Sequence, residues 1–184
     1  SLVSSGMAMN RVKFIRYGSG SLILFFVFIL QSTVLRSIQI RGIVPNVMII
    51  TIISFALLRG KIDGALAGAA LGLLQDIYFG EVIGFYAIIY MYIGFATGFL
   101  YMNFYKDSIL LPIGVMTAAD VLVNLIVYFF TFLFRGQLQF HLYLGQIIIP
   151  ELIYTLFVGF LIYRILYMIN SVVEEIEWSK EYEE

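Results

Sequence analysis

The chain has 184 residues, of which 61% are hydrophobic and only 12% are charged, and its formal net charge is −1. Soluble domains carry about 25% charged residues, so this composition excludes an ordinary soluble domain and favours a protein embedded in lipid. Having no cysteine and a single histidine excludes disulfides, thiolate nucleophiles and any site that needs two histidines. The pI of about 5.8 also argues against nucleic acid as a partner.

The two ends of the chain differ in composition from the apolar remainder. Residues 1–8 have a linker-like composition and are interpreted as a cloning remnant, with a natural disordered tail as the alternative. Residues 171–184 are rich in glutamate and are expected to form an acidic cytoplasmic tail that extends the last membrane span. A solvated, fraying end is the alternative for this tail. Residues 9–170 are predicted to form one transmembrane domain.

This domain is predicted to be an all-α bundle of six membrane-spanning helices. A span needs about 20 apolar residues, and fewer inside a bundle. The segments that meet this criterion are residues 19–37, 44–58, 62–79, 85–103, 109–134 and 142–169. Pro45 is expected in the first turn of the second span, where its missing N–H costs nothing. A chain of five spans is the alternative.

Lysine and arginine set the expected orientation. With six spans and a cytoplasmic N-terminus, eight basic residues fall on the inner side, against Arg36, Arg41 and Arg135 on the outer side. Cytoplasmic loops are enriched in these residues, so both termini are predicted to be cytoplasmic.

A strip of small residues runs along the third span. Gly64, Gly68, Gly72 and Asp76 are spaced four residues apart, so they share one face of a helix. The fourth span carries a second Gly-xxx-Gly pair, formed by Gly94 and Gly98. Such faces let helix backbones approach closely in lipid. They are predicted to pack within the bundle or against a partner.

Polar side chains inside the spans predict a second kind of site. Ionisable groups are costly in a membrane and usually face the bundle interior. Asp120 lies near the middle of the fifth span with Asn124 on the same face, Glu151 lies in the outer half of the sixth, and Gln31 belongs to a polar notch in the first. We expect a polar cavity or a partner-binding seam, with plain interhelical hydrogen bonding as the alternative.

Specific contacts or distortions are expected at two positions, Asp76 and Pro150. Asp76, near the outer end of the third span, is expected either to pair with Arg36 or Arg41 or to hold the turn at residues 79–84. Pro150 interrupts the sixth span and frees the carbonyl of Gln146, which predicts either a kink or a broken helix that lines a cavity.

Several features occur in a fixed order along the chain. They are Gln31 late in the first span, the pair Pro45-Asn46 that opens the second, the glycine helix that ends in GLLQD at 72–76, FGEVIG at 79–84, and Asp120 in the fifth span. This ordered set, across residues 10–169, resembles the MreD family of bacterial rod shape-determining proteins.

The resemblance implies a non-enzymatic scaffold in the bacterial inner membrane, within the cell-elongation machinery. Family members sit with MreC, a single-span protein, and link MreB filaments to the glycosyltransferase RodA and a penicillin-binding transpeptidase. A fold similar to the S-components of energy-coupling-factor vitamin transporters is also implied. Membrane lipid and a second copy of the chain are further expected partners, and no cofactor is expected.

Two other functions remain as alternatives. A transport S-component would capture a small vitamin from outside, but the first span lacks the Ala-xxx-Ala pattern typical of these proteins. An intramembrane enzyme would use Asp76 and Asp120 as acid and base. No nucleophile motif, metal-ligand motif or phosphate-binding loop accompanies these carboxylates.

Overall fold

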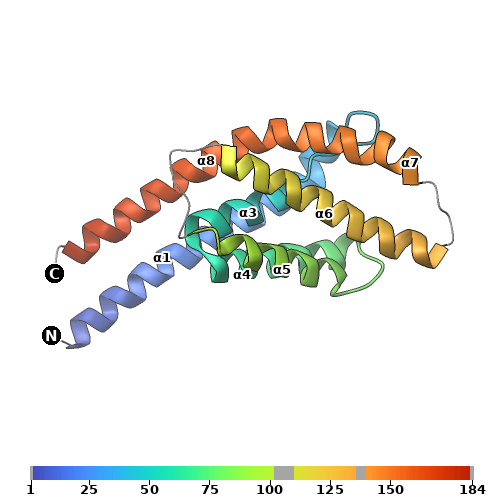
Figure 1. Cartoon of the computed structure of the whole chain (residues 1–184). Coiled ribbons are helices and arrows are strands. Elements are labelled where there is room, and N and C mark those ends of the chain that lie inside the picture. The colour runs from blue at the N-terminus through green and yellow to red at the C-terminus, as the bar shows by residue number, and fades with distance from the viewer. Residues whose placement is uncertain (1, 102–109, 136–139, 183–184) are drawn as a thin grey trace.

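The computed structural model describes residues 2–101, 110–135 and 140–182, and these residues form a bundle of helices (Figure 1). The elements are α1 (Leu2–Ile29), the π-helix η1 (Leu30–Val34), α2 (Leu35–Ser37), α3 (Val47–Arg59), α4 (Lys61–Phe79), α5 (Phe85–Gly98), α6 (Leu110–Arg135), α7 (Phe140–Tyr143), the π-helix η3 (Leu144–Ile148) and α8 (Ile149–Tyr182). The π-helices join their neighbours with helical backbone on both sides, so the described chain makes six helical rods.

The prediction of an all-helical protein is confirmed, and each expected span corresponds to one rod. Three rods are long and apolar enough to cross a membrane, over Lys13–Ser37, Leu110–Phe132 and His141–Ile176. Helices α3 and α5 are apolar but shorter. Six crossings therefore remain a prediction, because length and composition alone establish three candidates.

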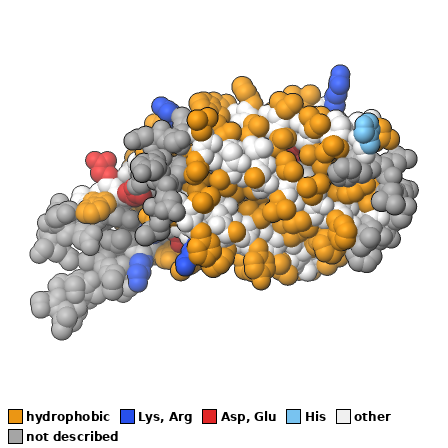
Figure 2. All heavy atoms as spheres, viewed as in Figure 1, with side chains coloured by type: hydrophobic (Ala, Val, Ile, Leu, Met, Phe, Trp, Pro, Cys, Tyr) orange, Lys and Arg blue, Asp and Glu red, His pale blue; other side chains and the backbone are white. Residues whose placement is uncertain are grey.

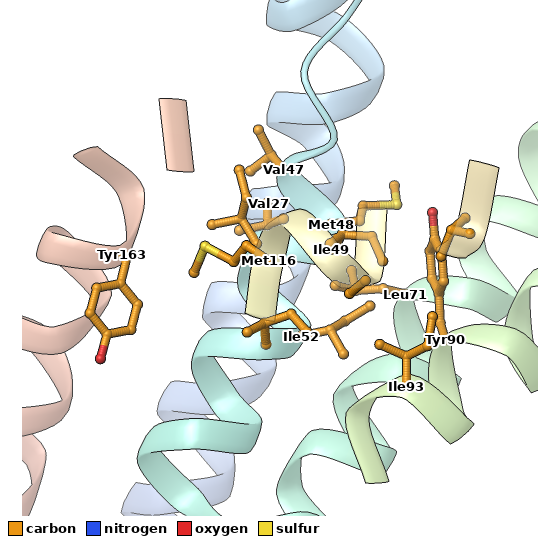
Figure 3. Close-up of a cluster of buried hydrophobic side chains, with 14 of the residues drawn as sticks. Val27, Val47, Met48, Ile49, Ile52, Leu71, Tyr90, Ile93, Met116 and Tyr163 are labelled. Carbon is orange, nitrogen blue, oxygen red and sulfur yellow. The ribbon is translucent and has the colours of Figure 1, made fainter. Parts of the chain in front are cut away.

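Helix α3 is the centre of the bundle. All its residues from Val47 to Leu58 are buried, and it packs against α1, α4, α5, α6 and α8. A helix that is apolar on every side is stable only when other elements surround it. Figure 3 shows Met48, Ile49 and Ile52 at the middle of the core, with side chains of α4 and α5 beside them and Tyr163 of α8 across the cluster.

The outer surface of the bundle is apolar. Large side chains such as Leu22 and Phe26 of α1, and Phe157 of α8, are more than 60% exposed. Hydrophobic side chains cover the middle of the face seen in Figure 2. Soluble monomers rarely expose apolar surface on this scale, so the surface fits contact with lipid.

The start of α3 corrects one detail of the sequence analysis. Asn46 is the N-cap, and its side-chain oxygen accepts a hydrogen bond from the backbone N–H of Ile49 at 3.2 Å. Pro45 therefore lies before the cap and not in the first turn. Asparagine is a preferred N-cap residue because its side chain accepts a hydrogen bond from a helix N–H that would otherwise have no partner.

Both ends of the described chain lie at the same end of the bundle, where α1 and α8 extend beyond the other helices (Figure 1). The expected tail continues α8 as a helix as far as Tyr182. Helix α1 begins at Leu2, so most of residues 1–8 are helical in the structure. Their origin as a cloning remnant remains a prediction.

A polar network ties the rods together at the end that carries the termini. The Arg16 guanidinium donates to Asp63 Oδ2 at 2.8 Å and to the Arg59 carbonyl oxygen at 3.0 Å. Arg59 donates in turn to the Arg16 carbonyl oxygen and to Asn170 Oδ1, at 3.0 and 2.9 Å. Helices α1, α3, α4 and α8 are therefore held together by charge-assisted hydrogen bonds.

Candidate functional site

The glycine strip of α4 faces α5. A Cβ on Gly68 would overlap the carbonyl oxygen of Tyr90, and a Cβ on Gly72 would lie 2.5 Å from the Cα of Ala87. A Cβ on Gly64 would also lie 2.7 Å from a carbonyl oxygen of α5. Only glycine therefore allows these two helices to meet backbone to backbone.

The Gly-xxx-Gly pair of α5 forms the other half of the same contact. A Cβ on Gly94 would overlap the carbonyl of Gly64, and a Cβ on Gly98 would overlap the backbone of Lys61. The two predicted strips thus pack against each other inside the bundle. Any surface that binds another protein lies elsewhere in this structure.

Asp76, at the end of the strip, caps the next helix. Its carboxylate is 1% exposed and accepts hydrogen bonds from the backbone N–H groups of Gly84, Tyr86 and Ala87, at 2.9, 2.9 and 3.0 Å. A negative charge is favourable at a helix N-terminus, where these N–H groups lack helical partners. The expectation that Asp76 holds the turn is confirmed.

The alternative pairing of Asp76 with an arginine is not what the structure shows. Arg36 lies instead over the ring of Phe79, with its guanidinium carbon 4.5 Å from the ring centroid. Arg41 is exposed in the loop before α3. The three backbone donors already satisfy the carboxylate without a cation.

A second polar cluster surrounds the start of α3. The Asn46 backbone N–H donates to Thr155 Oγ1 at 3.0 Å, and its side-chain amide donates to Asp120 Oδ1 at 3.3 Å. The next backbone N–H, that of Val47, donates to Gln31 Oε1 at 2.8 Å. Gln31, Asn46 and Asp120, which the sequence analysis singled out on three different spans, therefore meet at one helix cap together with Thr155 of α8.

Beside this cap lies a polar pocket of about 220 Å³. Every rod contributes to its lining. The lining residues are Gln31, Val44, Asn46, Met48, Gln75, Tyr86, Tyr90, Val123, Asn124, Val127, Tyr143 and Glu151. Gln31, Asn124 and Glu151 were expected in a polar cavity or a partner-binding seam, and the structure brings them together here with Asn46.

The pocket combines acidic and amide side chains. Glu151 lines it, while Asp120 is 1% exposed and lies just behind the lining, joined to Asn46. Asn124 donates to the Asp120 backbone carbonyl at 3.0 Å. Asp120 Oδ2 is buried and has no hydrogen-bond partner among the described residues. Such an atom is costly unless something satisfies it.

The two acids that were considered as a catalytic pair belong to separate groups. Asp76 is occupied by the N-terminus of α5, whereas Asp120 is bonded to the cap of α3. Within the described ranges, no three His, Asp or Glu side chains gather in a way that could hold a metal ion. The arrangement is suited to binding and not to acid–base chemistry between these two residues.

Both π-helices flank the pocket. Gln31 belongs to η1, and η3 lies between Tyr143 and Glu151. Pro150 lies in the first turn of α8, and the rod runs from η3 through it without a gap, so the helix is distorted but not broken. Single π-helical turns inside α-helices occur often at functional sites, because they re-aim nearby side chains.

Three lining tyrosines were missed by the sequence analysis. Tyr86 and Tyr90 lie eight and four residues before Gly94, so they continue the same face of α5, and this spacing was a usable signal. The abundance of aromatic residues obscured it. Tyr143 had no comparable signal, because its position depends on the π-helix that follows it.

Comparison with known families gives one finding. A family model described as rod shape-determining protein MreD matches residues 13–175, which reach from α1 into the C-terminal part of α8. No curated protein and no solved structure matches the chain.

Proposed function

Because the chain belongs to the MreD family of rod shape-determining membrane proteins, we propose that it is a non-enzymatic scaffold of the bacterial cell-elongation machinery. In this proposal it binds an MreC-like single-span protein in the cytoplasmic membrane. It thereby helps to couple MreB filaments to peptidoglycan synthesis by RodA and a penicillin-binding transpeptidase. The observation that carries the proposal is the family match over residues 13–175.

The partner's membrane helix is proposed to bind in a groove between α1 and α4. This groove has a volume of about 260 Å³ and contains four small residues, Gly20, Ser21, Ala67 and Ala70. Ser21 and Ala70 are exposed on the outside of the bundle. Small residues allow a second backbone to approach, and the glycine face of α4 is already occupied by α5.

Co-purification in a gentle detergent tests this surface. Ala70→Leu fills the groove and is expected to reduce recovery of the co-expressed MreC-like partner at least tenfold. The matched control is Ala96→Leu, which enlarges an exposed alanine of α5 and should leave recovery unchanged. Loss of the partner with Ala96→Leu alone would place the interface on α5 instead.

Removal of residues 179–184 distinguishes a partner interface in the membrane from one in the cytoplasm. The truncated protein should retain the partner, because the proposed contact lies between membrane helices. Release of the partner by this truncation, with both alanine variants retaining it, would contradict the membrane scaffold and favour a cytoplasmic adaptor.

Both termini are proposed to be cytoplasmic. Their shared end of the bundle supports an even number of crossings (Figure 1). The chain has no native cysteine, so single cysteines report cleanly. An impermeant thiol reagent added outside intact cells should label Val82→Cys, between α4 and α5, and should not label Lys61→Cys at the start of α4. The reverse labelling pattern would show that the protein has the opposite orientation in the membrane.

The polar pocket favours one second candidate, a small-molecule binding subunit similar to a transporter S-component. Deleting the gene distinguishes the two functions. A scaffold of cell elongation should leave rounded cells with normal vitamin uptake. Cells that keep their rod shape and lose uptake would favour the transporter subunit.

A further inference from the structure

The polar pocket has an acidic side chain and no basic one among its described lining residues. Glu151 lines the pocket, and no Lys, Arg or His is among the described lining residues. Asp120 lies just behind, bonded to Asn46. Carboxylates away from water are costly unless a partner compensates their charge, so the pocket is suited to a positive ligand.

An unused acceptor lies close to the pocket. Asp120 is 1% exposed, one of its oxygens accepts from Asn46, and the other has no partner within the described part of the chain. Buried polar atoms are nearly always satisfied in native proteins. Asp120 is not among the lining residues, so its unused oxygen adds to the acidic surroundings of Asn46 and Asn124 and leaves Glu151 as the carboxylate that lines the pocket.

Aromatic side chains form part of the pocket wall. Tyr86, Tyr90 and Tyr143 all line it, and the rings of Tyr86 and Tyr90 meet edge to face with centroids 5.6 Å apart. Aromatic faces attract cations, and their use with a carboxylate is a recurrent means of holding an ammonium group. The amide side chain of Gln75 lies in the same wall, whereas the side-chain oxygen of Gln31 already accepts from Val47.

The size of the pocket limits the ligand. Its volume of about 220 Å³ equals roughly seven waters at ~30 Å³ each. It lies below the ~300–1,000 Å³ of pockets that take drug-sized ligands. A small amine or the headgroup of a lipid therefore fits, whereas a whole nucleotide does not.

We propose that this pocket binds an ammonium group, with Glu151 as its counter-ion and the three tyrosines as its aromatic wall. The ammonium could belong to a soluble amine or to the ethanolamine headgroup of a phospholipid. The two sources share the same recognition chemistry and are separated by the experiment.

The test measures thermal stabilisation of the full chain, purified in detergent and delipidated. Ligands that bind only the folded state raise its melting temperature. Ethanolamine and short-chain phosphatidylethanolamine are compared with N-acetylethanolamine, which lacks the charge, and with phosphatidylglycerol, which lacks the amine. Ethanolamine and the amine lipid should stabilise the protein, while the two controls should not.

Variants assign the effect to the pocket. Glu151→Gln keeps the shape and should weaken amine binding at least tenfold, while Glu81→Gln, an exposed glutamate between α4 and α5, should leave it unchanged. Tyr86→Leu removes part of the aromatic wall and should also weaken binding, and it serves as the test if Glu151→Gln does not fold.

The outcomes are distinct. Tighter binding of phosphatidylethanolamine than of ethanolamine identifies a lipid ligand, and equal binding identifies a soluble amine. The proposal is overturned if neither amine stabilises the protein, if N-acetylethanolamine does so equally, or if the pocket variants bind the amines as well as the parent.

Discussion

Two pairs of helices flank α3, and they are assembled in different ways. Helices α4 and α5 meet backbone to backbone through their glycines, and an added Cβ at Gly68 or Gly94 would overlap the opposite helix. Helices α6 and α8 also contain glycines, but a Cβ on Gly114 would meet nothing within 4 Å. A Cβ on Gly159 would meet only side chains, at 3.5 Å.

The difference shows that glycine does not by itself create close packing. Near the cap of α3, by contrast, α6 and α8 present polar side chains: Asp120 and Asn124 on α6, and Glu151 and Thr155 on α8. Thr155 and Asp120 accept hydrogen bonds from Asn46 at this cap, and Asn124 and Glu151 line the pocket beside it. One pair of helices is therefore held by backbone contact, and the other contributes polar side chains to the cap of α3 and to the pocket.

The largest expected loss of stability comes from disrupting the backbone contact between α4 and α5. Gly68→Ala places a methyl group against the Tyr90 carbonyl, where the backbone cannot yield as a side chain would. Overpacking costs about 1–3 kcal/mol when side chains can adjust, so we expect a loss of about 3 kcal/mol or more. The melting temperature and monodispersity in detergent report it.

Gly114→Ala is the matched control on α6. The new methyl group has open space, and alanine is a better helix former than glycine by up to about 1 kcal/mol. This variant should melt at or above the parent temperature. Equal melting of the Gly68→Ala variant and the parent would contradict the close contact.

Asp76→Asn is expected to have a smaller effect on the same pair. The carboxylate uses both oxygens to accept three backbone N–H groups, and an amide offers only one oxygen. At least one donor at the start of α5 loses its partner, which costs about 1–3 kcal/mol. Glu175→Gln, on an exposed position of α8, should change the unfolding free energy by less than ~0.5 kcal/mol. Identical stability of the two variants would exclude the capping role.

The smallest expected change in stability concerns α6 and α8. Thr155→Val removes the acceptor of the Asn46 backbone N–H while preserving the shape of the side chain. We expect destabilisation of about 1 kcal/mol. Thr117→Val removes only a hydrogen bond to Ile113 within α6 and should cost less. If both variants melt alike, the bond between α8 and the cap contributes nothing to stability.

The sequence predicted the local features of the fold better than the contacts between helices. Apolar runs located the rods, and a four-residue spacing identified the glycine faces, because both signals lie within one segment. Nothing local identifies α5 as the neighbour of the α4 strip. The pair Arg16–Asp63 joins residues 47 positions apart, and only the folded bundle brings them together.

The pocket was predictable in part for the same reason. Polar residues inside apolar spans are conspicuous, so Gln31, Asn124 and Glu151 were identified. Their meeting at the cap of α3 depends on helix packing, and the positions of Tyr143 and Glu151 depend on a π-helical turn that no sequence pattern predicted.

Helix α8 is longer than a bilayer is thick, and its length determines how far its end extends from the membrane. It runs from Ile149 to Tyr182 without a break. At about 1.5 Å per residue it reaches roughly 50 Å, whereas the hydrocarbon core of a bilayer is about 30 Å thick. When α8 crosses near the membrane normal, about 20 Å of it stands clear of the lipid tails. The length of the helix therefore sets the distance between the lipid and any protein that contacts the acidic end of α8. Inserting two helical turns of neutral residues would raise that height by about 10 Å and leave the charge unchanged.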